Sequence, residues 1–239
     1  MVSIIIPCFS DKYLNEATKS CVSQDYDDIE IIVVLDGPKE EFWAATGLLD
    51  RFLTMTNKKN LGTAESINVG LRLSKGDYIM ILAADDMLTK DSISRRIKMF
   101  EEDPELDAIY GFMLKVQGDC SYEEAQKVVP RRHPSEYTVP LYRRRVFQKY
   151  GLLHPPMRGR EDKEYSYRLG VHSKSPFERR VKIRKADYDV YYYRRHEQAQ
   201  RKARTRDIYR EIGLHMAFDK RMKDLEINGI TEKNTEFLK

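Results

Sequence analysis

The first hundred residues alternate short apolar runs with segments of helical periodicity, and this alternation restricts the fold more than any other feature. Three runs have the β-branched and aliphatic content of buried strands: Val2–Pro7, Glu30–Leu35 and Tyr78–Leu82. Apolar residues at helical spacing predict three helices: one that Ser10 or Asp11 can cap, one over Phe42–Leu53 and one over Thr63–Ser74. Phe52–Thr56 could turn into a further strand. Strands that alternate with helices of about a dozen residues are typical of a parallel α/β sheet.

The second half is less regular. We expect a strand over Asp107–Val116, helices over Leu141–Tyr150 and Glu161–Val171, strand structure over Val181–Arg195 and a long charged helix over Glu197–Leu225. No linker marks an independent second domain. We therefore predict a single domain over residues 1–239.

The charge is distributed unevenly. Residues 1–120 hold 13 Lys and Arg against 21 Asp and Glu, whereas residues 121–239 hold 29 against 17. A basic half suits nucleic acid, an anionic membrane surface or a phosphorylated substrate, or it is simply a solvated surface. No zinc finger, RNA-recognition motif or basic zipper is present, so we expect no nucleic acid partner. A hydrophobic content of 41% excludes a disordered chain.

The apolar runs are too short to cross a bilayer, and the N-terminus has no basic leader. The three cysteines have no metal-binding spacing and too small a number for a disulfide framework, which favours a reducing compartment. We therefore expect a cytoplasmic protein, with peripheral contact at the inner membrane face as an open alternative.

Aspartates follow two of the predicted strands, at the edge where parallel sheets bind ligands. Asp36 follows the second strand and could accept hydrogen bonds from a base or ribose, or serve only as a turn residue. Asp85 and Asp86 follow the strand at Tyr78–Leu82 and could hold a divalent cation together with a diphosphate. One of the pair could equally cap the next helix.

The order of these motifs resembles the family 2 glycosyltransferases over roughly the first hundred residues. The resemblance is carried by Val2-Ser3-Ile4-Ile5-Ile6-Pro7, Ile31-Ile32-Val33-Val34-Leu35-Asp36-Gly37, Asn60-Leu61-Gly62, Asn68-Val69-Gly70, Gly76-Asp77-Tyr78-Ile79 and Leu82-Ala83-Ala84-Asp85-Asp86. It implies a GT-A fold with a mostly parallel central sheet flanked by helices and a C-terminal acceptor-side subregion. Within this domain, residues 1–118 would form the nucleotide-sugar-binding half, residues 119–196 the acceptor and catalytic half, and residues 197–239 a helical C-terminal extension. It also implies a nucleotide-diphosphate sugar donor, most often UDP-linked, a Mn²⁺ or Mg²⁺ ion, and transfer with inversion at the anomeric carbon.

The resemblance also implies roles for individual residues on the donor side. The nucleotide-binding set is Pro7, Phe9, Asp36, Gly62, Asn68, Ala84, Asp85 and Arg194, and the metal set is Asp85, Asp86 and His196. Asp85 takes the place of the last aspartate of the family's Asp-x-Asp motif, while Ala83 stands where the first aspartate is expected. Arg194 and His196 resemble a pattern that approaches the diphosphate or metal, although a solvent-facing basic strand end would look the same.

On the acceptor side, Glu161-Asp162 resembles the family's Glu-Asp motif. Asp162 is the predicted general base, which takes the proton of the attacking hydroxyl, and Glu161 is a predicted acceptor or positioning contact. Two acids at a helix N-terminus are also favoured by the helix dipole alone. Expected acceptors are a glycan, a lipid-linked molecule or a small molecule with a hydroxyl group.

Two alternative functions stay open. The missing first motif aspartate at Ala83 allows a non-catalytic member of the same fold that binds a nucleotide or a partner. A sugar nucleotidyltransferase is less favoured, because Cys8-Phe9-Ser10-Asp11 replaces the glycine-rich basic loop that it needs after the first strand. The C-terminal segment could pack on the domain, close over the donor, contact a membrane or form a homodimer.

Overall fold

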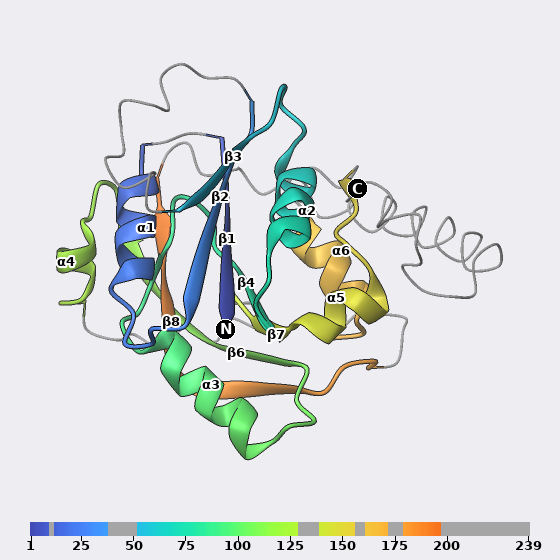
Figure 1. Ribbon diagram of the computed structural model, residues 1–239. Coiled ribbons are helices and arrows are strands. Elements are labelled where there is room, and N and C mark those ends of the chain that lie inside the picture. Colours follow the sequence, from blue (N-terminus) through green and yellow to red (C-terminus); the bar gives the residue numbers. More distant parts are fainter. Residues whose placement is uncertain (10–11, 38–51, 129–138, 156–160, 172–178, 197–239) are drawn as a thin grey trace, which may run out of the picture.

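The computed structural model describes residues 1–9, 12–37, 52–128, 139–155, 161–171 and 179–196 (Figure 1). Within these ranges, eight strands form one sheet in the order β3-β2-β1-β4-β7-β6-β8-β5. The strands are β1 Val2–Cys8, β2 Ile29–Leu35, β3 Leu53–Thr56, β4 Tyr78–Ile81, β5 Met87–Leu88, β6 Ala108–Gln117, β7 Leu141–Arg143 and β8 Ile183–Arg195. The helices are α1 Leu14–Val22, α2 Thr63–Leu73, α3 Ser92–Glu102, α4 Tyr122–Ala125, α5 Arg144–Tyr150 and α6 Glu161–Arg168.

Most of the sheet is parallel. β1 pairs in parallel with β2 and β4, and β2 pairs in parallel with β3. β7 is antiparallel to both β4 and β6, so β6 runs in the same direction as β4, and β8 is parallel to β6. As a result, β1, β2, β4 and β8 all end at the same edge of the sheet, and β5 is a short antiparallel strand beside β8.

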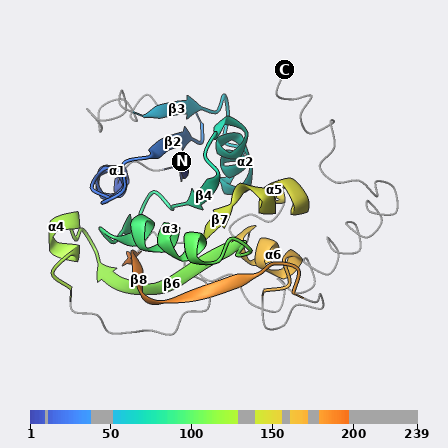
Figure 2. The same cartoon turned by 60° about the horizontal axis from the view of Figure 1, so that its bottom comes forward.

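Helices cover both faces of the sheet, which explains the continuous apolar character of the central strand (Figures 1 and 2). Along β1, Ile4 and Ile6 pack in one buried cluster with residues of α1 and α3. Ile5 points to the other face and packs with residues of α2, α5 and α6. A Cβ on Gly70 would overlap the Ile5 side chain, so glycine at this position allows α2 to lie close to the sheet.

The structure confirms a mixed α/β fold with a mostly parallel sheet, but it corrects one predicted element. Leu141–Tyr150 is not a single helix: its first three residues form β7, and the helix begins only at Arg144. Leu141 pairs with Met80 of β4, a tertiary contact that local periodicity does not reveal. The predicted helices over Phe42–Leu53 and Glu197–Leu225 lie wholly or largely outside the described residues. None of the described helices is long and apolar enough to span a membrane.

Candidate active site

The residues singled out by the sequence gather at the edge where the parallel strands end. By strand they are Pro7 and Phe9 for β1, Asp36 for β2, Ala84, Asp85 and Asp86 after β4, and Arg194 and His196 for β8. Pro7 and Ala84 are half-buried, whereas Phe9 is 54% exposed and presents an open apolar side chain. Open sheets of this kind bind ligands beyond the carboxyl ends of their strands, so this edge is the candidate site.

Asp36 organises the loop that leads into α2. The residue is only 4% exposed, and its carboxyl group accepts hydrogen bonds from the backbone N–H of Leu61 at 2.7 Å, the backbone N–H of Gly62 at 2.8 Å and the amide of Asn57 at 3.0 Å. Gly62 has a φ of 86°, which favours glycine, and it is the N-cap residue of α2. Asp36 and Gly62 are therefore parts of one structure, in which the carboxylate holds the glycine loop in place.

The adjacent aspartates Asp85 and Asp86 lie in opposite environments. The Asp85 side chain is 37% exposed, and its Oδ2 lies 3.0 Å from Nε2 of His196, whose side chain is 11% exposed. Asp86 points inward and accepts a 2.9 Å hydrogen bond from the backbone N–H of Arg194. Burial, and after it the Asp85 carboxylate, raises the pKa of Asp86 well above its usual range. Only Asp85 of the pair thus faces the ligand side, and it does so together with His196.

Arg194 is almost completely buried, although the sequence predicts a contact with the nucleotide diphosphate. It is 1% exposed and donates to the backbone carbonyls of Asp85 at 2.9 Å, Gly118 at 2.7 Å and Cys120 at 2.8 Å. A guanidinium group engaged by three carbonyls fixes the loop after β4 against the end of β6. Arg194 therefore supports the site by holding its backbone in place from inside the protein. A direct contact of Arg194 with the diphosphate stays a prediction.

Tyr13 belongs to this site, and no signal in the sequence singled it out. Its ring centroid lies 5.0 Å from that of His196 and 4.4 Å from the guanidinium carbon of Arg194, while its hydroxyl group donates to Asp119 at 3.1 Å. The ring therefore fills the space between the two residues and limits the orientations of the imidazole. Tyr13 immediately precedes α1. An aromatic residue at such a position is just as common in a protein where it only packs in the core, so the sequence does not mark it as part of a site.

The candidate base Asp162 lies in the first turn of α6, beside the buried Glu161. The Asp162 side chain reaches solvent, but the surrounding protein limits its hydration and this desolvation raises the pKa of its carboxyl group, with Lys163 opposing the shift. The Tyr191 phenol is buried in β8. Its pKa is raised by burial and then by negative charges that include those of Asp86, Asp162 and Asp85.

Asn68 has a structural role in the described part of the chain. Its side chain is buried in the middle of α2, donates to the carbonyl of Leu153 at 2.9 Å and accepts from the N–H of Leu153 at 3.0 Å. The same amide contacts Glu65 at 3.2 Å. These bonds tie α2 to the loop after α5, so Asn68 joins the two halves of the domain, and a nucleotide contact by this residue stays a prediction.

The side chains present fit a divalent ion that is held only in part by the protein. Within the described ranges, no group of three or more His, Cys, Asp or Glu side chains could hold a metal ion. Asp85 and His196 offer one carboxylate and one imidazole nitrogen, a donor pair that suits an ion completing its shell with water and diphosphate oxygens.

Comparison with solved structures places the fold among the GT-A glycosyltransferases. S. aureus TarS in complex with UDP-GlcNAc matches with a TM-score of 0.65 at 18% identity, covering 88% of this chain and 64% of that chain. The mannosyltransferase PcManGT of Pyrobaculum calidifontis, in complex with GDP-Man and Mn²⁺, matches with a TM-score of 0.59 at 16% identity, covering 83% and 58%. Identities this low establish the fold alone.

The sequence comparison is more specific. The family model for glycosyl transferase family 2 matches residues 3–165, and the chain belongs to this family. That span includes Asp36, Asp85 and Asp162 and ends before Arg194 and His196. An uncharacterized glycosyltransferase of Methanocaldococcus jannaschii is 26% identical over 66% of this chain and 54% of its own length. One from Haemophilus influenzae is 26% identical over 71% and 62%. The chain thus spans a little over half the length of these relatives.

Proposed function

We propose that this chain transfers a sugar from a nucleotide-diphosphate sugar, with UDP as the favoured nucleotide, to a hydroxyl acceptor with inversion. The observation that carries the proposal is the contact of Asp85 with His196 at the edge where the parallel strands end. Family membership supports the reaction class. The UDP-GlcNAc complex of TarS and the GDP-Man complex of PcManGT support a nucleotide-sugar donor.

In this proposal the donor lies along the carboxyl edge of the sheet. The loop held by Asp36 brings the Gly62 backbone close to the nucleotide, and the exposed Phe9 offers an apolar surface beside it. Asp85 and His196 lie side by side at this edge, with their donor atoms 3.0 Å apart. A Mn²⁺ or Mg²⁺ ion, held by these two residues, would offset the charge that develops on the departing nucleotide. Arg194 holds the loop that carries Asp85 in place by donating a hydrogen bond to the Asp85 carbonyl.

Asp162 supplies the proton acceptor in the proposed reaction. The acceptor oxygen attacks the anomeric carbon, the bond from that carbon to the diphosphate oxygen breaks, and the hydroxyl proton passes to the Asp162 carboxylate. Attack from the face opposite the leaving group gives inversion. Desolvation raises the pKa of Asp162, and a carboxylate with a higher pKa is a stronger base once it is ionised.

The test is a thermal-shift series with UDP, GDP, CDP and dTDP, each with and without Mn²⁺. A nucleotide present at about 100 times its dissociation constant stabilises the fold by about 2.7 kcal/mol, which is readily measured. We expect one nucleotide to stabilise strongly only with Mn²⁺, and we expect Asp85→Asn to abolish that shift. The exposed Asp187→Asn is the matched control, and it should behave like the unmodified chain. The absence of any nucleotide-dependent shift would contradict the donor site.

A second candidate is a non-catalytic nucleotide-binding member of the family. It is favoured by Ala83, which is exposed where the family motif places a carboxylate, and by the inward orientation of Asp86. The two candidates differ in turnover. A donor sugar hydrolysed or transferred at a rate that Asp162→Asn abolishes identifies a transferase, whereas nucleotide binding without any such turnover identifies the binding protein.

A further inference from the structure

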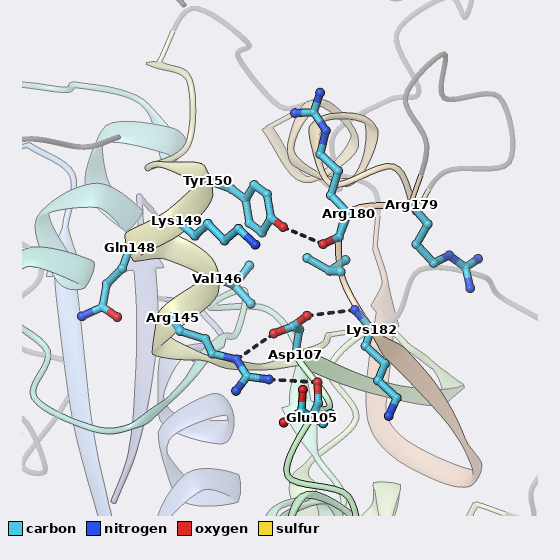
Figure 3. Close-up of a pocket in the computed structure, with 11 residues that line it drawn as sticks. Glu105, Asp107, Arg145, Val146, Gln148, Lys149, Tyr150, Arg179, Arg180 and Lys182 are labelled. Carbon is cyan, nitrogen blue, oxygen red and sulfur yellow. Dashed lines mark hydrogen bonds and ion pairs between the residues drawn. The ribbon is translucent and has the colours of Figure 1, made fainter. Parts of the chain in front are cut away.

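A hollow of about 760 Å³ opens at the end of the sheet opposite the candidate active site (Figure 3). It lies between α5, the turn before β6 and the segment that leads into β8. Its lining comprises Glu105, Asp107, Arg145, Val146, Gln148, Lys149, Tyr150, Arg179, Arg180, Val181 and Lys182. None of these residues belongs to the predicted donor or acceptor site. The volume lies within the range of small-molecule binding sites.

Hydrogen bonds between the three elements keep the hollow open. The Tyr150 hydroxyl group donates to the Arg180 carbonyl at 2.5 Å, which joins α5 to the segment before β8. Asp107 accepts the backbone N–H of Lys182 at 2.9 Å and the Nε–H of Arg145 at 2.8 Å, which joins the turn before β6 to both other walls. Val146 and Val181 are buried beneath these bonds. These bonds link the three walls of the hollow to one another.

The lining is strongly cationic, with five Arg and Lys residues against two carboxylates. Two of the five cations are paired: Arg145 with Asp107 of the lining, and the Lys182 ammonium with Asp103 at 3.0 Å. Among the described residues, no carboxylate forms an ion pair with Lys149 or Arg179. The Lys149 ammonium lies 5.2 Å from the centroid of the Tyr150 ring, and Figure 3 shows it beside this ring, inside the lining.

We propose that this hollow binds a ligand through a phosphate group, carried either by a soluble phosphorylated molecule or by a phospholipid headgroup. A phosphate monoester carries between one and two negative charges at neutral pH, so it can use several cations at once. The Lys149 side chain lies between the walls, and Arg179 and Arg180 stand on the wall that faces it, so a phosphate group could accept hydrogen bonds from more than one of these side chains. Residues 121–239 hold 29 basic and 17 acidic residues, and five of the basic residues line this hollow.

This site is separate from the proposed donor site and does not depend on the proposed function. β8 starts beside the hollow and ends at the candidate active site, and its 13 residues cover roughly 40 Å of extended chain. A phosphate bound in the hollow is thus too distant to be the diphosphate of the donor. The binding also needs no divalent ion, whereas the donor site is expected to need one.

The first experiment is calorimetric titration with inorganic pyrophosphate in buffer that contains a chelator. We expect the Lys149→Glu variant to bind pyrophosphate about tenfold more weakly than the unmodified chain, because it loses a charged donor and gains a repulsive charge. Lys98→Glu is the matched control, since Lys98 is exposed on α3, outside the hollow, and should leave the affinity unchanged. Lys149→Met tests the same contact without a new negative charge.

The second experiment separates the two sources of phosphate by sedimentation with vesicles. Binding to phosphatidic acid vesicles but not to phosphatidylcholine vesicles, lost in Lys149→Glu and kept in Lys98→Glu, assigns the hollow to a lipid headgroup. Pyrophosphate binding without vesicle binding assigns it to a soluble ligand. The proposal is overturned if neither probe binds, or if both lysine variants bind equally well. A missing nucleotide shift with Mn²⁺ would contradict the proposed function only, because these titrations contain no divalent ion.

Discussion

The two ends of the sheet differ in how they use charge. At the carboxyl end, the ionisable side chains are tied into the fold: Asp36 holds a loop, Asp86 is buried beneath Asp85, and Arg194 binds three carbonyls. At the opposite end, Arg145 and Lys182 form ion pairs, but no described carboxylate pairs with Lys149 or Arg179, which line an open hollow. An end that performs chemistry needs fixed geometry, whereas an end that collects an anion needs accessible charge. The following changes test whether the two ends are independent.

The largest effect is expected from Asp162→Asn at the carboxyl end. Loss of a general base lowers turnover by about 10²–10⁴-fold, because no side chain then takes the proton of the attacking hydroxyl group in the transition state. Nucleotide binding with Mn²⁺ should remain, and metal-free pyrophosphate binding at the other end should not change. Steady-state kinetics and calorimetry measure the two effects, with the exposed Asp27→Asn as the control. Turnover within tenfold of the unmodified chain would remove Asp162 from the reaction.

Arg194→Met should have the largest effect on stability. The substitution leaves the carbonyls of Asp85, Gly118 and Cys120 without their donor in a buried place, which costs about 3 kcal/mol of the free energy of unfolding. The neighbouring Arg195 is exposed, so Arg195→Met is a close control with little expected change. Urea unfolding of both variants measures the difference. Equal midpoints would mean that the arginine network does not support the carboxyl end.

The pH dependence of the reaction is a smaller and more specific effect. Asp162 must be ionised to accept a proton, so kcat/KM should rise with pH through the pKa of Asp162. Because desolvation raises that pKa, the rise should lie above pH 4, the usual range of an aspartate. The same shift means that the folded state binds this proton more tightly than the unfolded chain, so the contribution of Asp162 to stability falls as pH rises through the shifted pKa. A rate profile from pH 4 to 8 tests this, and the residual rate of Asp162→Asn should lack the rise.

The sequence predicted the central strands well because burial on both faces leaves a direct signal. β1, β2 and β4 match their predicted runs to within one residue at each end. α3 was not predicted, although Ile93, Ile97 and Phe100 stand at helical spacing and are buried. The helical periodicity of α3 is thus as visible in the sequence as that of α2.

The orientation of site residues could not be predicted in the same way. Nothing local distinguishes Asp85 from Asp86. The pairing of β5 with β8 turns one aspartate to the surface and the other toward the backbone of Arg194. The burial of Arg194 likewise depends on carbonyls of residues 118 and 120, more than 70 positions away in the sequence. Such contacts follow from the strand order, which the sequence pattern alone does not give.

The smallest effect is expected from Asp107→Asn, which tests the hollow directly. This substitution should lower the free energy of unfolding but strengthen the binding of pyrophosphate. Asp107→Asn weakens the ion pair with Arg145, whose side chain is 46% exposed, so the free energy of unfolding should fall by about 1 kcal/mol or less. The change also removes a negative charge from the lining, so metal-free pyrophosphate should bind roughly threefold more tightly. A general loss of structure would weaken both properties together. Weaker pyrophosphate binding in Asp107→Asn would therefore show that the carboxylate acts mainly by holding Arg145 and the walls in place, and unchanged nucleotide binding would confirm that the two ends act separately.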